Sequence, residues 1–134
     1  MTRGLLKRLI FQGSIILALL GLVSIPASEA AAPATAAEVG QLLTTLERSP
    51  CMFNRNGKWY SASEARAHLE MKFRYFVDQD SISTTEDFIN LAATTSSRSG
   101  KPYQVQCAGE DPVPSATWLT EELHRIRTGA PPVR

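Results

Sequence analysis

Three chemically active side chains recur every four residues in the middle of the chain: Glu64, His68 and Lys72. Residues four apart lie on the same face of a helix, so we expect these side chains to stand together. In that arrangement His68 could act as a general base oriented by Glu64, or the two could begin a metal site. The alternative is a polar network at the edge of the core, with His68 hydrogen-bonded to the loop at 96–103. A metal needs at least one more ligand and His124 stands alone, so we expect neither a metal nor a cofactor.

A second group of candidates surrounds a predicted hairpin. The Asn-Gly pair at 56–57 is the strongest short hairpin signal because both residues accept a positive φ angle. A two-residue turn there places Arg55 opposite Lys58, and directly opposed like charges are unfavourable without a counter-charge. If this turn meets the loop that carries Arg98 and Lys101, four cations and several backbone N–H groups form an anion-binding concavity. The alternative is a solvated turn in which Arg55 pairs with a nearby carboxylate.

The loop at 96–103 contributes hydroxyl and aromatic groups as well. Ser97 and Ser99 lie near Lys101, which could serve a serine nucleophile as its base, but no catalytic serine motif surrounds them. Serines beside Gly-x-Pro are typical of turns. Trp59 and Tyr103 could offer a stacking surface for a sugar or peptide, although such aromatics are more often half-buried anchors. We assign no catalytic residue, and the candidate ligand-binding residues are Arg55, Asn56, Glu64, His68, Lys72, Ser99, Lys101 and Tyr103.

Helices and strands must position these residues. Apolar spacing predicts a helix of about three turns from Ala36 and helices over 62–77, 84–94 and 115–127. We expect capping boxes at Ser61-x-x-Glu64 and Ser83-x-x-Glu86, and Ser115 as the cap of the last helix. The third helix should bury Phe88, Ile89, Leu91 and Ala92.

The strands are predicted at 51–54, 58–60 and 103–107. The hairpin register pairs Arg55 with Lys58, Asn54 with Trp59 and Phe53 with Tyr60. The order α-ββ-α-α-β-α predicts a small α+β domain over 36–127, with a three-stranded antiparallel sheet packed by helices. Residues 31–35 read as a flexible lead-in and 128–134 as a disordered tail.

The first thirty residues have the pattern of an export signal. A positive start is followed by the uncharged run 9–25, and the small residues Ser28 and Ala30 suit cleavage after Ala30. The alternative is an uncut N-terminal anchor, since the uncharged stretch just reaches the length needed to cross a bilayer. Either reading places the rest of the chain outside the cytoplasm, in the periplasm or secreted.

Export changes how the two cysteines are interpreted. Cys51 and Cys107 are the only ones, and in an oxidising compartment we expect a disulfide bond between them. Closing a loop of this length stabilises a fold by roughly 4 kcal/mol on the chain-entropy estimate. Two free buried thiols are the alternative, and a redox pair is disfavoured because no C-x-x-C motif is present.

One combination of motifs resembles a known family. Its longest run is Phe53-x-Arg55-Asn56-Gly57-x-x-Tyr60-x-Ala62-x-Glu64-Ala65-x-x-His68-Leu69-x-x-Lys72. Two later segments match in the same order, Thr85-x-x-Phe88-Ile89 and Ser97-x-Ser99-Gly100-x-Pro102-Tyr103. Together they resemble the YfeK-like family of small exported bacterial proteins, a domain of unknown function, over about residues 36–127. The resemblance implies an exported single-domain protein and supplies no reaction, ligand or catalytic residue.

Charge and composition narrow the function. The chain has 14 basic against 13 acidic residues, and this balance lacks the basic excess of a nucleic-acid-binding domain. We therefore predict a small exported binding or interaction module of the cell envelope, with an envelope protein or an anionic envelope component as its partner. No stable membrane span is expected after cleavage. The alternatives are an enzyme that uses His68 as acid or base, and an N-terminally anchored structural partner.

Overall fold

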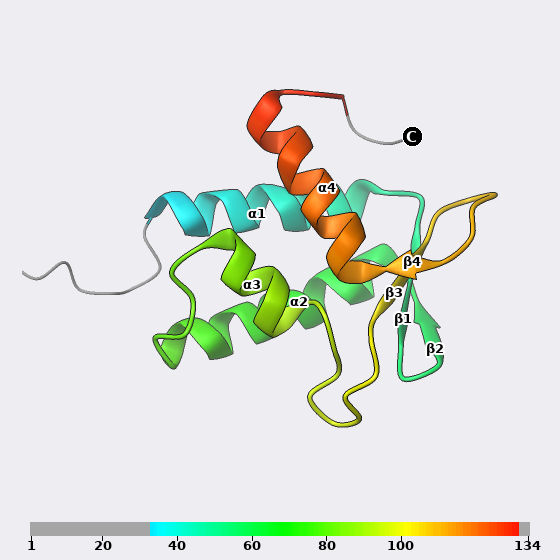
Figure 1. Ribbon diagram of the computed structural model, residues 1–134, viewed down its shortest axis with the longest axis horizontal. Coiled ribbons are helices and arrows are strands. Elements are labelled where there is room, and N and C mark those ends of the chain that lie inside the picture. The colour runs from blue at the N-terminus through cyan, green and yellow to red at the C-terminus, as the bar shows by residue number, and fades with distance from the viewer. Residues whose placement is uncertain (1–32, 132–134) are drawn as a thin grey trace, which may run out of the picture.

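The computed structural model describes residues 33–131, so the predicted export signal and the end of the predicted tail lie outside the described residues. The helices are α1 (Pro33–Arg48), α2 (Ala62–Asp78), α3 (Thr85–Ala92) and α4 (Ser115–Thr128). They lie together, and a small sheet lies at one end of the group (Figure 1). No helix in this part of the chain is long and apolar enough to cross a membrane.

The sheet has four antiparallel strands in the order β2-β1-β3-β4, so the predicted α+β class is confirmed and the predicted three strands are wrong. The strands are β1 (Met52–Arg55), β2 (Lys58–Tyr60), β3 (Gln104–Gln106) and β4 (Val113–Pro114). No strand was predicted at the position of β4. This strand has only two residues and contains a proline, so it carries no alternating pattern that a sequence could reveal.

The β1–β2 hairpin has the predicted register. Phe53 pairs with Tyr60, Asn54 with Trp59 and Arg55 with Lys58. Asn56 and Gly57 both have positive φ angles, 54° and 81°, as the turn requires. The backbone N–H of Gly57 donates to the side-chain oxygen of Asn54, and this hydrogen bond links the turn to β1.

Helix starts differ from the prediction at three places. α1 begins at Pro33, where proline is favoured in the first turn, and not at Ala36. The capping box of α3 is formed by Thr84 and Asp87, one residue later than the expected pair. α4 has no side-chain cap, because Ser115 is the first helical residue and is buried. The capping box of α2, Ser61 with Glu64, is present as predicted.

The core lies where the helices meet the sheet. α4 contributes Trp118, whose ring packs edge-on against Phe53 of β1 at 5.9 Å between centroids. Between α2 and α3, Phe73 and Phe88 make a similar contact at 5.5 Å. Leu91 was expected in this core and is instead exposed, because the short α3 turns only one face toward its neighbours.

The disulfide bond is present as predicted. It joins Cys51, directly before β1, to Cys107, directly after β3. β1 and β3 are adjacent in the sheet and pair through backbone hydrogen bonds. The disulfide bond therefore links two segments that already lie side by side. It closes a loop that contains the hairpin, α2 and α3.

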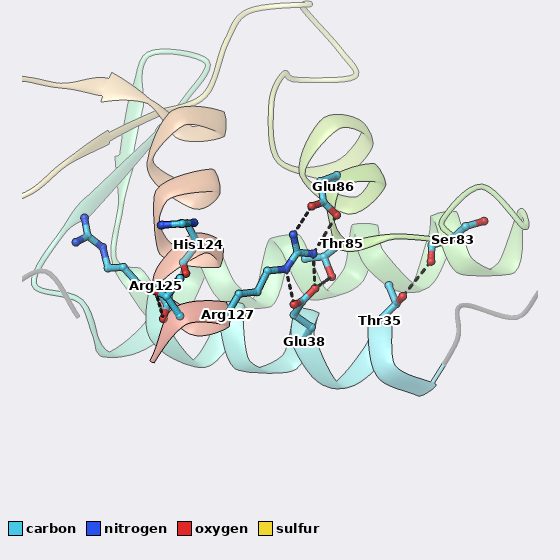
Figure 2. A network of polar contacts seen from close by, with 9 residues as sticks. Thr35, Glu38, Ser83, Thr85, Glu86, His124, Arg125 and Arg127 are labelled. Carbon is cyan, nitrogen blue, oxygen red and sulfur yellow. Dashed lines mark hydrogen bonds and ion pairs between the residues drawn. The ribbon is translucent and has the colours of Figure 1, made fainter. Parts of the chain in front are cut away.

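An ionic contact joins the three helices α1, α3 and α4 (Figure 2). Arg127 of α4 donates to the carboxylates of Glu38 on α1 and Glu86 on α3, with N–O distances from 2.5 to 3.2 Å. Glu38 also accepts a hydrogen bond from the buried hydroxyl of Thr85. We call these four residues the helix clamp.

Candidate functional site

The hairpin tip and the loop at 96–103, whose contact is the condition for the anion site, lie together. The hydroxyl of Ser99 donates to the side-chain oxygen of Asn56 at 2.5 Å, which joins the hairpin tip to the loop between α3 and β3. That loop is closed at its base by a bridge between Thr95 and Pro102 and by a hydrogen bond from the N–H of Ser96 to the carbonyl of Lys101. Both loops are therefore held in place by hydrogen bonds, and the loop descends beside the hairpin (Figure 1).

A basic groove of about 780 Å³ lies between the hairpin, α2 and this loop. Its wall combines basic and aromatic side chains with one methionine and two serines. These are Arg55, Lys58, Lys72 and Arg98, then Tyr60, Tyr75, Phe76 and Tyr103, with Met71, Ser96 and Ser97. Asn56 and His68 complete the wall. We call this cavity the basic groove.

Arg55 stands at the centre of the polar contacts in the groove. Its Nη1 lies 2.6 Å from Nδ1 of His68 and its Nη2 lies 3.3 Å from the hydroxyl of Tyr60. The guanidinium also lies 4.9 Å from the centre of the Tyr60 ring, a cation–π distance. The alternative, in which Arg55 pairs with a carboxylate, is not observed within residues 33–131.

His68 has both ring nitrogens in contact with neighbours. A guanidinium can only donate, so Nδ1 accepts from Arg55 and the ring proton is on Nε2, which lies 3.3 Å from the hydroxyl of Tyr103. Burial, and then the positive charges of Arg55 and Lys72, lower the pKa of His68 to about 4. The ring is therefore neutral at physiological pH and would be a weak general base there.

Lys72 is a buried cation. Lys72 is only 8% exposed, although a lysine is almost never fully buried unless it is paired. Its Nζ donates to the backbone carbonyl of Thr95 at 3.3 Å and lies 5.3 Å from the centre of the Tyr103 ring. Burial, and then the charge of Arg55, lower the pKa of Lys72. No carboxylate of the described chain forms an ion pair with it.

Two of the predicted site residues are placed differently from the rest. Glu64 does not orient His68; its Oε2 accepts hydrogen bonds from the backbone N–H and the hydroxyl of Ser61, as its role in the capping box requires. These bonds lower the pKa of Glu64. Lys101 is exposed and does not line the basic groove. The groove brings together Arg55, Asn56, His68, Lys72 and Tyr103, and Ser99 supports it from the second loop.

Sequence reasoning missed several residues of the groove wall, among them Tyr60, Met71 and Tyr75. Tyr60 was predicted as the hairpin partner of Phe53, and its contact with Arg55 was not anticipated. Met71 and Tyr75 are exposed on α2 and line the groove. Their spacing of four residues, one position before Lys72 and three after it, was the signal that could have found them.

Metal chemistry has no visible support in the described residues. Within 33–131, no group of three or more His, Cys, Asp or Glu side chains is placed to hold a metal ion. The donors that line the groove are mainly cationic or aromatic, and such a set favours an anion. What the arrangement can do chemically is to hold a negative charge beside apolar rings.

The fold and the groove define a small disulfide-linked α+β domain with a basic, aromatic-lined site. The model of a family of unknown function, DUF5329, matches residues 33–127, which is nearly all of the described chain. The protein therefore belongs to this family. No curated protein and no solved structure matches the chain.

Proposed function

We propose that this protein is a small exported binding module of the cell envelope that holds an anionic envelope component in the basic groove. One observation carries the proposal. Lys72 is more than nine-tenths buried, faces the groove and has no carboxylate partner within residues 33–131. A buried charge without a partner is costly, so a bound anion would supply the missing counter-charge.

The neighbours of Lys72 support the same interpretation. Arg55 lines the groove and its hydrogen-bond partners are neutral groups, His68 and Tyr60, which leaves its positive charge uncompensated by the described residues. Lys58 and Arg98 add two more positive charges to the wall. Electrostatic attraction would therefore draw an anion into the groove, and it would weaken as salt rises.

Export is the second part of the proposal. The charge pattern of residues 1–30, the YfeK-like resemblance and the Cys51–Cys107 disulfide bond support it, since disulfides persist in oxidising compartments. N-terminal sequencing of the exported protein tests it. We expect Ala31 as the first residue, and an intact Met1 would favour the anchored alternative.

Anion binding is tested by NMR titration of the labelled protein with soluble anionic fragments of bacterial envelope, using inorganic phosphate as a reference anion. Lys72→Met and Arg55→Gln should each weaken binding at least about tenfold, which corresponds to about 1.4 kcal/mol. Lys101→Gln is the matched control. Lys101 is a cation of the loop at 96–103, but it does not line the groove. Equal affinity in all three variants would overturn the proposal.

The alternative function, an enzyme with His68 as acid or base, has no comparable support. The ring nitrogens of His68 contact Arg55 and Tyr103, and its pKa of about 4 leaves it a weak base at neutral pH. We therefore do not adopt the enzyme hypothesis.

A further inference from the structure

A second, smaller cavity lies next to the basic groove. It has a volume of about 130 Å³ and reaches toward the core between β1 and α2. Its wall includes Phe53, Ala65 and Leu69, all of which belong to the buried core. Because these side chains are apolar, this part of the cavity offers a contact for a hydrocarbon group, whereas Asn54, Gln104 and Ser115 add polar groups elsewhere in its wall. We call it the inner cavity.

The two cavities share one wall. Arg55, Tyr60, His68 and Tyr103 line both the inner cavity and the basic groove. These four side chains contact one another through Arg55–His68, Arg55–Tyr60 and His68–Tyr103, so the polar rim between the two spaces is continuous. A ligand at this rim has cations on one side and apolar core residues on the other.

The size of the inner cavity sets the size of the apolar group. An apolar protein cavity of about 150 Å³ is large enough to bind benzene. The inner cavity, at about 130 Å³, would therefore hold a compact group of about six carbon atoms, and the rest of a longer chain would extend out of it without further burial.

The charge at the rim sets the other end of the ligand. The cation that lines both spaces is Arg55, whose planar guanidinium has five N–H donors, of which His68 and Tyr60 occupy two. A carboxylate matches the remaining donors of a guanidinium in plane. Lys72, which lines the basic groove, supplies a second cation, a compact ammonium group.

We propose that the anion bound here is a small amphipathic carboxylate, with its carboxylate at Arg55 and Lys72 and its apolar group in the inner cavity. The inference rests on the proposed function, because it names the ligand class of the same site. Glu64 also lines the inner cavity, and its negative charge opposes such a ligand. Its Oε2 is held by Ser61, so the carboxylate stays in the helix cap.

The test is a calorimetric or NMR titration with acetate, butanoate, hexanoate and octanoate, and with hexanamide as an uncharged counterpart of hexanoate. Each added methylene should tighten binding about fourfold up to hexanoate, the factor that corresponds to about 0.8 kcal/mol per buried CH₂. Octanoate should bind no more tightly than hexanoate. Hexanamide should bind at least about tenfold more weakly than hexanoate.

Three variants sharpen the result. Ala65→Leu fills the inner cavity and should remove the chain-length dependence. Arg55→Gln should weaken all the carboxylates alike. Glu64→Gln preserves the helix cap, since glutamine also serves in a capping box, and should strengthen binding at low salt.

The outcomes separate the two proposals. Carboxylates that bind without any dependence on chain length, or hexanamide that binds as tightly as hexanoate, would overturn the inference and leave the basic groove as an anion site. If neither these carboxylates nor the envelope fragments bind, both proposals are overturned. The length series on the unmodified protein decides the matter even if Ala65→Leu does not fold.

Discussion

The helix clamp and the basic groove handle positive charge in opposite ways. In the helix clamp, Arg127 is neutralised by two carboxylates, those of Glu38 and Glu86 (Figure 2). In the basic groove, Arg55 and Lys72 contact only neutral acceptors and aromatic rings among residues 33–131. An internally neutralised cation joins elements of the fold, whereas cations left without a counter-charge favour a ligand.

The burial of the two regions differs in the same sense. Arg127 is exposed, so water and salt already screen its charge. Lys72 is buried and its charge is poorly solvated. A buried cation without a carboxylate partner costs free energy of folding, so replacing it distinguishes a structural role from a ligand-binding one. Four predictions test this distinction, in order of decreasing effect.

The largest effect concerns the disulfide bond between the ends of β1 and β3. Replacing Cys51 and Cys107 together by alanine should lower the free energy of unfolding by about 2–4 kcal/mol, because the unfolded chain regains the entropy of an open loop. Urea denaturation of both proteins measures the difference. The loss should not depend on salt, in contrast to any loss from the helix clamp. An unchanged midpoint would contradict the prediction.

The next effect is a pH dependence that comes from His68. Its pKa is about 4 when folded and about 6.5 when unfolded, so the unfolded state binds more protons between these values. Stability is therefore complete above about pH 6.5 and falls as the pH is lowered toward 4. Between about pH 7 and pH 5 we expect a loss of about 1–2 kcal/mol, allowing for the partial exposure of the ring.

His68→Asn is the control for this pH effect. It should flatten the stability curve over that interval, where the carboxylates of the helix clamp remain ionised because their pKa values are lowered by Arg127. An equally steep curve in the variant would assign the pH dependence to another group. Thermal or urea unfolding at a series of pH values provides the measurement.

A smaller effect, of opposite sign, is expected at Lys72. Lys72→Met replaces a buried cation by an apolar side chain of similar length, so it should raise the free energy of unfolding by about 1 kcal/mol. The carbonyl of Thr95 loses its donor, but Thr95 is exposed and water can replace it. Urea denaturation measures the change, and a clear destabilisation would show that Lys72 has a structural role.

The smallest effect is expected in the helix clamp. Arg127→Gln leaves Glu38 and Glu86 facing each other without their cation, which should lower the melting temperature at low salt. The decrease should shrink at high salt, since exposed charges are screened. Anion binding in the basic groove should be unchanged, and a weaker affinity in this variant would contradict the separation of the two regions.

Local signals predicted much of the fold. The Asn-Gly turn sets the register of β1 and β2. A two-residue turn at 56–57 places Arg55 opposite Lys58, and the other strand pairs follow from that pair. The capping box at Ser61 and Glu64 fixes the start of α2 for the same kind of local reason. The fourth strand, β4, is formed by pairing with β3 and carries no local pattern of its own, so the sequence did not reveal it.

The site was predictable only in part. Arg55 and Tyr103 were candidate residues and line the groove, since turn positions can be located from the sequence, but the meeting of the two loops was only a condition. The choice between Lys72 and Lys101 as the cation of the groove depends on how α2 packs against the loop, which no spacing rule contains. The contact of Tyr60 with Arg55 depends on side-chain direction across the hairpin and was missed for that reason.

Both edges of the sheet affect how this protein can meet another chain. β2 has three residues and begins with Lys58, and β4 has two residues and ends with Pro114, which has no N–H to donate. Short edges with a charge or a proline resist the addition of a further strand. Backbone pairing at these edges is therefore a poor route to recognition and to aggregation alike, and side chains must provide the selectivity.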